Sequence, residues 1–178
     1  MNAAKNLIAI TALLWSLGAG ASPALLGIEP GITTVGELRQ KYGDAELLAH
    51  KTSEFGGPIY RVDGQLTGAE DVIEARYIFN RNGVPVAMTG VFNEAKFEHI
   101  NLMLGMKYTM VKYSNRPLAS HGQQRFAWYK DGDLLISLTQ PQGSEFVYLT
   151  YADQRTRNLI SASLKPDEKQ DTRKIWDY

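Results

Sequence analysis

The sequence predicts an α+β fold in which an antiparallel sheet is built from two tandem repeats, each a helix followed by four strands. Three observations support this prediction. Short segments alternate apolar and polar residues, glycine turn pairs such as Asn82-Gly83 separate them, and helix-capping residues precede each helical stretch. Strands that follow one another in runs favour antiparallel pairing, with the helices packed on one face. The predicted domain covers residues 22–165, with repeat halves at about 27–92 and 93–152, a closing C-terminal helix at 153–165 and a charged tail at 166–178.

Residues 1–21 have the three-part layout of a secretory signal peptide. Lys5 supplies the charge, Leu7–Trp15 the apolar run, and Ala19-Gly20-Ala21 a small-residue cleavage site. The apolar run is shorter than the roughly 20 residues that span a bilayer. We therefore predict cleavage after Ala21, a periplasmic or secreted location of the Gram-negative type, and no transmembrane anchor.

The charge balance and the absence of cysteine exclude several functional classes. The chain of 178 residues carries 19 basic and 19 acidic side chains, which gives no electrostatic basis for binding nucleic acid. Without cysteine there are no disulfides, thiolate metal sites or cysteine nucleophiles. A lipid-modified cysteine is also excluded, so the protein is predicted not to be a lipoprotein.

The first predicted helix lies between Thr34 and Gly43. Thr34 and Glu37 have the spacing of a capping box, in which each side chain bonds the backbone N–H of the other. Val35, Leu38 and Tyr42 then form one apolar stripe. Gly43 is expected to end the helix in the left-handed conformation.

Four strands are predicted to complete the first half. Alternation is clearest where Ala75, Tyr77 and Phe79 interleave with Glu74 and Arg76, as in a half-buried strand. The segment 66–71 is predicted to be a loop. The predicted strands cover residues 45–51, 58–62, 73–79 and 84–92.

The second half repeats this order. Asn93 is the expected N-cap of a helix whose apolar stripe contains Phe97, Ile100 and Leu104, and Gly105 is expected to end it. Asp153 is then the expected cap of the closing helix. The predicted strands of this half cover residues 108–113, 125–130, 134–139 and 146–151.

Corresponding positions in the two halves indicate an internal duplication. The Asn82-Gly83 turn matches Gln142-Gly143, because each lies between the last two strands of its half. The two turns are about 60 residues apart, which fits the length of a supersecondary repeat. The alternative is a chance likeness between two stretches of ordinary α+β sequence.

The segment Gly27–Gly43, with Gly31, Thr33, Thr34 and Leu38 at matching positions, resembles the opening of the SmpA/OmlA-type outer-membrane lipoproteins. The element order is similar to the tandem α+β fold of the β-lactamase inhibitor proteins. These resemblances imply short helices on an antiparallel sheet and a role in binding proteins. The chain departs from both families, because the first carries a lipid-modified cysteine and the second has disulfides.

No catalytic or metal-binding motif is recognisable. The three histidines, His50, His99 and His121, have no ligand spacing, so no metal or cofactor is predicted. Ser120 beside His121 does not make a triad, since triad residues meet in space and not in sequence. A small periplasmic hydrolase with an unrecognised site stays open as an alternative, as does a carrier of a small apolar ligand.

Aromatic residues on the predicted strands are the remaining functional signal. Alternation places Phe126 and Trp128 on one face of their strand, and Ala127 and Tyr129 on the other. An aromatic patch on the sheet face without helices would mark a binding site. We therefore predict a soluble protein-binding or adaptor module without catalysis that binds another envelope protein through an exposed patch comprising Trp128, Tyr129, Tyr148 and Tyr151.

Overall fold

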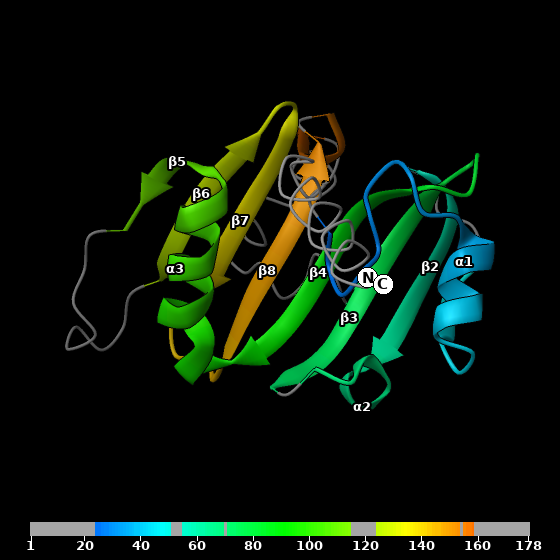
Figure 1. The fold of residues 1–178 in the computed structure, drawn as a ribbon, viewed down its shortest axis with the longest axis horizontal. Coiled ribbons are helices and arrows are strands. Elements are labelled where there is room, and N and C mark those ends of the chain that lie inside the picture. The colour runs from blue at the N-terminus through cyan, green and yellow to red at the C-terminus, as the bar shows by residue number, and fades with distance from the viewer. Residues whose placement is uncertain (1–23, 51–54, 70, 115–123, 154, 159–178) are drawn as a thin grey trace, which may run out of the picture.

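The computed structural model describes residues 24–50, 55–69, 71–114, 124–153 and 155–158 (Figure 1). Within these ranges there is no helix with the length and apolar content required to cross a membrane. The predicted signal peptide, the charged tail and the Ser120-His121 pair lie outside the described residues, as does most of the predicted closing helix.

A single eight-stranded antiparallel sheet forms the body of the protein, which confirms the predicted α+β class (Figure 1). Its strand order is β1-β2-β3-β4-β8-β7-β6-β5. Strands that follow each other in the chain are neighbours within each run of four, and β4 pairs with β8 in the middle. The strands are β1 (Glu46–Ala49), β2 (Gly56–Asp63), β3 (Val72–Asn80), β4 (Pro85–Asn93), β5 (Thr109–Tyr113), β6 (Arg125–Asp131), β7 (Leu134–Gln140) and β8 (Phe146–Asp153).

Helix α1 (Val35–Lys41) begins with the predicted capping box. The Thr34 hydroxyl accepts from the N–H of Glu37 at 3.2 Å, and the Glu37 carboxylate accepts from the N–H of Thr34 at 2.7 Å. The bond donated by the Thr34 N–H, and a second one donated by the Thr34 hydroxyl at 2.9 Å, lower the pKa of the Glu37 carboxyl. The helix ends just before Gly43, as predicted, with Tyr42 as the C-cap, but the prediction that Gly43 is left-handed is wrong. The Ala45 N–H bonds the Tyr42 carbonyl at 3.0 Å.

We expect Thr34→Ala to lower the free energy of unfolding by about 1 kcal/mol, since it removes the N-cap acceptor of α1. Urea denaturation followed by circular dichroism measures this change. Thr34→Ser keeps the hydroxyl and is expected to retain most of the stability. Equal losses for the two variants would contradict a capping role.

The second main helix also differs from its prediction at both ends. Asn93 is followed by a 3₁₀ turn, η1 (Glu94–Lys96), and its side chain makes no capping hydrogen bond. Helix α3 (Phe97–Lys107) runs through Gly105, which was expected to end it. The Tyr108 N–H bonds the carbonyl of Leu104, so the helix gains another half-turn beyond the predicted stop.

A short helix, α2 (Gly64–Thr67), occupies part of the segment predicted as loop. The Asp63 side chain accepts from the Gln65 N–H at 2.9 Å, and Gly68 ends the turn with φ of 66°. In the closing segment, the Asp153 carboxylate accepts from the Thr156 N–H, which fits the predicted cap, and residues 155–158 are helical.

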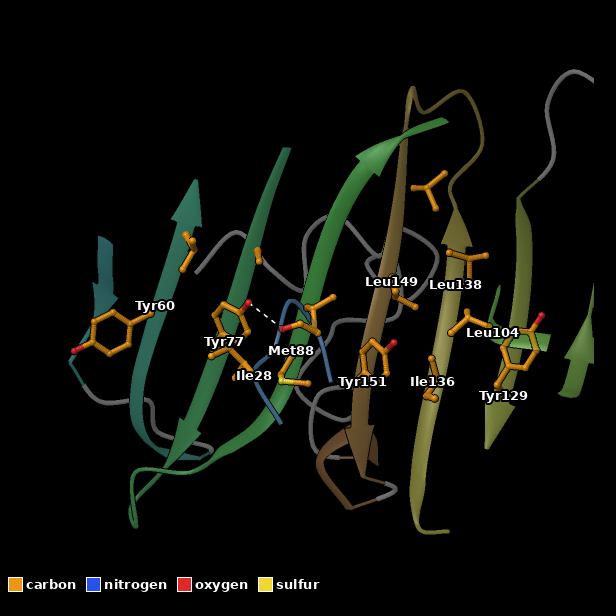
Figure 2. Close-up of a cluster of buried hydrophobic side chains, with 14 of the residues drawn as sticks. Ile28, Tyr60, Tyr77, Met88, Leu104, Tyr129, Ile136, Leu138, Leu149 and Tyr151 are labelled. Atoms are coloured by element: carbon orange, nitrogen blue, oxygen red, sulfur yellow. Dashed lines mark hydrogen bonds between the residues drawn. The ribbon is translucent and has the colours of Figure 1, made fainter. Parts of the chain in front are cut away.

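The main hydrophobic cluster lies between one face of the sheet and the helical segments. Figure 2 shows its large side chains, including Tyr77, Tyr129 and Tyr151. Leu38 of α1 and Leu104 of α3 are buried in the same cluster. The segment around Leu25 and Ile28 closes the middle of this face, where the Tyr77 hydroxyl donates to the Leu25 carbonyl at 3.3 Å.

Candidate binding surfaces

Two of the four predicted patch residues belong to the core. Tyr129 and Tyr151 are 0% and 4% exposed and lie in the main cluster. The Tyr129 hydroxyl donates to the Asn101 carbonyl of α3 at 2.9 Å. Burial raises the pKa of both phenols. The expectation that they form part of an exposed patch is therefore corrected.

Trp128 and Tyr148 lie on the opposite face of the sheet. Alternation along β6 turns Trp128 and Phe126 away from the main cluster, and their rings are 5.6 Å apart. Trp128 is partly buried, while Tyr148 is only 9% exposed. The predicted division of Phe126 and Trp128 from Ala127 and Tyr129 holds, but the four predicted patch residues do not share a face.

A transverse row of mostly polar side chains crosses this second face, with one residue from each strand. Register pairing connects every member to the next, so the row runs from one edge of the sheet to the other. In the middle of the row, the hydroxyls of Thr89 and Thr150 form a hydrogen bond of 3.0 Å. In strand order, the row is Glu46, Arg61, Arg76, Thr89, Thr150, Ser137, Trp128 and Lys112.

The β1 end of the transverse row is electrostatically satisfied. The Arg61 guanidinium donates to the Glu46 carboxylate at 2.8 Å, and this hydrogen bond is the main cause of its raised pKa. Arg76 donates to Glu74 at 2.7 Å, and Arg61 also contacts Glu74. Each cation here has a carboxylate partner, which indicates a structural role.

The β5 end of the row differs, because two cations gather around one indole. The Lys112 ammonium lies 5.3 Å from the Trp128 ring centre, and the Arg157 guanidinium lies 5.1 Å from it. Burial lowers the pKa of Arg157. Its Nη1 atom is buried and has no hydrogen-bond acceptor among the described residues.

A second feature is an apolar surface formed by α3 and β5, which we call the α3–β5 surface. All five residues of β5 are exposed. The helix adds apolar side chains on the side that faces away from the sheet. Its members and their exposed fractions are Leu102 63%, Met103 51%, Met106 68%, Met110 47%, Val111 56% and Tyr113 36%. This surface was not predicted from the sequence, although Leu102, Met103 and Met106 lie off the apolar stripe of Phe97, Ile100 and Leu104.

The acidic and histidine side chains of the described residues do not meet the requirements of a metal site. They contain no group of three or more His, Asp or Glu side chains suited to hold a metal ion. Asp131 and Asp133 are exposed at the β6–β7 turn, and Asp71 forms an ion pair with Lys96 at 2.6 Å.

No known protein family, curated protein or solved structure matches this chain. The resemblance to the SmpA/OmlA-type and inhibitor-type proteins stays a prediction.

Proposed function

We propose that this protein is an exported, non-catalytic binding module that works in the periplasm and receives an extended segment of another envelope protein along β5. The observation that supports it most directly is the α3–β5 surface, whose six large apolar side chains are all more than a third exposed. Exposed large apolar side chains gathered on one helix and on the strand that follows it mark a candidate protein interaction site.

The composition of the surface fits adaptable recognition. Three of its six residues are Met103, Met106 and Met110. Methionine is flexible and polarisable, so it can pack against partners of different shape. Leu102 and Val111 add fixed apolar area beside them.

The backbone of β5 supplies the second element of the proposed interface. In the described sheet β5 pairs with β6 alone, so its other edge is unpaired. Lys112 is paired with Trp128, and the Ser114 N–H bonds the Phe126 carbonyl at 2.8 Å. Because antiparallel bonding alternates along a strand, the backbone groups of Tyr113 point to the free edge. An extended peptide can add there as a ninth strand.

The geometry also supports a definite kind of occupant. Met110 and Tyr113 are paired with Tyr129 and Ala127, so they lie on the sheet face that α3 covers. An added strand places every second side chain on this face. The proposed partner segment is therefore extended, with apolar residues at alternate positions. The register shift between Met110 and Lys112 interrupts the edge and disfavours indiscriminate pairing.

The proposal is tested with a blocked synthetic peptide of alternating valine and threonine, titrated into the ¹⁵N-labelled full chain. We expect the backbone amides of Met110 and Tyr113 to shift and to become protected from hydrogen exchange. The double variant Met110→Glu/Tyr113→Glu is expected to weaken binding about tenfold or more, since charges replace apolar contacts on the face along which the added strand lies.

The matched control is Ile32→Glu/Leu66→Glu, which adds the same charges at exposed apolar positions outside the α3–β5 surface. It is expected to leave affinity within twofold. Equal weakening by both double variants, or amide shifts confined to β1, would contradict the proposed interface.

We also infer that the two halves descend from one duplicated unit whose helices cover the same sheet face. Each half has one main helix followed by a four-strand meander, and β4 and β8 pair as the last strand of each half. The hairpin glycines Gly83 and Gly143 both have positive φ, 71° and 66°. Leu38 and Leu104 enter the same cluster from the two helices.

A further inference from the structure

We propose that the second face of the sheet, opposite the main cluster, binds a carboxylate group between Arg157 and Lys112 beside the indole of Trp128. This site does not depend on the α3–β5 surface, which involves other side chains.

The Arg157 side chain carries an unsatisfied donor. Its Nη1 is buried, and no acceptor among the described residues satisfies it. Buried donors in proteins are nearly always hydrogen-bonded, so an orphan on a guanidinium points to an absent acceptor. The planar fork of arginine matches the two oxygens of a carboxylate. A carboxylate is therefore the acceptor that best satisfies the Arg157 guanidinium.

The charge around Trp128 is positive among the described contacts. The Lys112 ammonium lies over both aromatic rings, 5.3 Å from Trp128 and 5.4 Å from Phe126. The ion pairs formed between described residues include neither Lys112 nor Arg157. The β1 end of the transverse row balances its arginines with Glu46 and Glu74, whereas at this end no carboxylate of the described residues pairs with Lys112 or Arg157. An incoming anion supplies it.

The aromatic rings beside the two cations favour a carboxylate that is attached to an apolar group. The Phe126 and Trp128 rings form a partly buried apolar floor next to the two cations. Such a floor favours an organic carboxylate over a strongly hydrated inorganic anion. Two sources share this chemistry: a free small carboxylate, and an Asp or Glu side chain of a protein partner.

The experiment follows the Trp128 indole N–H by NMR in the full chain, while sodium acetate or benzoate is titrated against sodium chloride at constant ionic strength. We expect the Trp128 indole N–H signal to shift saturably with both carboxylates. Benzoate is expected to bind with higher affinity than acetate, because its ring packs on the Phe126 and Trp128 rings. Arg157→Gln is expected to weaken binding about tenfold or more, and Arg157→Lys to weaken it less. Lys112→Gln is expected to have an intermediate effect.

Two charge-matched controls separate this site from general electrostatics. Arg155→Gln removes the same charge from an exposed position in the same helical segment, and Lys107→Gln removes a lysine that lies 5.0 Å from the Tyr108 ring. Both are expected to leave affinity within twofold. A chloride titration that moves the Trp128 signal equally, or equal losses for Arg155→Gln and Arg157→Gln, would overturn the proposal.

A blocked peptide with one Glu, compared with its Gln analogue, distinguishes the two sources. Binding of the Glu peptide that is much tighter than that of acetate assigns the site to a partner side chain. Equal affinities assign it to free carboxylates. Equal binding of the Glu and Gln peptides, together with no saturable response to acetate or benzoate, would overturn the site altogether.

Discussion

Tyr129→Ala is expected to lower the free energy of unfolding by about 3–5 kcal/mol, the range found when large aromatic residues are removed from protein cores. The Tyr129 ring is fully buried between β6 and α3. Its loss leaves a cavity under the helix, and it also removes the bond from the hydroxyl to the Asn101 carbonyl. Denaturation in guanidinium chloride, followed by circular dichroism, measures the change.

Two variants isolate the contributions. Tyr129→Phe keeps the ring and is expected to cost about 1 kcal/mol, since only the hydrogen bond is lost. Trp128→Ala, one residue earlier on the partly buried face, is expected to cost clearly less than Tyr129→Ala. A larger loss for Trp128→Ala than for Tyr129→Ala would show that the core had been assigned to the wrong face of β6.

Gly64→Ala is expected to destabilise the protein by about 2–3 kcal/mol, in the range caused by overpacking. A Cβ at this position would lie 1.8 Å from the backbone carbonyl oxygen of Val72 and 2.6 Å from the carbonyl carbon. Both atoms belong to the backbone at the start of β3, so no side-chain rotation relieves the contact. The chain at the α2–β3 junction has to move instead.

Gly43→Ala is the matched control for this substitution. Apart from its chain neighbours, no atom of the described residues lies within 4 Å of where its Cβ would be, and its φ is not positive. Alanine restricts the unfolded chain, so this variant is expected to gain about 0.4–1 kcal/mol. Urea midpoints that fall together for Gly43→Ala and Gly64→Ala would contradict the close approach at Gly64.

The strands and hairpins could be predicted from the sequence because their signals are local. A period of two along residues 73–79 is enough to identify β3. Gly83, Gly132 and Gly143 each follow a polar turn residue or Asp and have positive φ in the structure. Thr34 and Glu37 likewise fix the start of α1 through contacts three residues apart.

The faces and the helix ends could not be predicted, because they depend on packing between distant segments. Alternation separates Trp128 from Tyr129 but does not say which of them lies under α3. Gly105 was expected to end α3, yet the Tyr129 hydroxyl lies 3.9 Å from where its Cβ would be, so strand β6 packs closely at this point. Contacts between residues this far apart in the chain cannot be predicted from the pattern of neighbouring residues.

The central pairing of β4 with β8 has a consequence for folding kinetics. Every other ladder in the described sheet joins strands that follow each other in the chain, whereas Thr89 and Thr150 meet across 61 residues. The entropic cost of closing a long loop therefore falls on this one pairing, and the pairing also raises the contact order of the fold. The two meanders can nucleate as local hairpins, and the rate of folding is set by the encounter of their last strands.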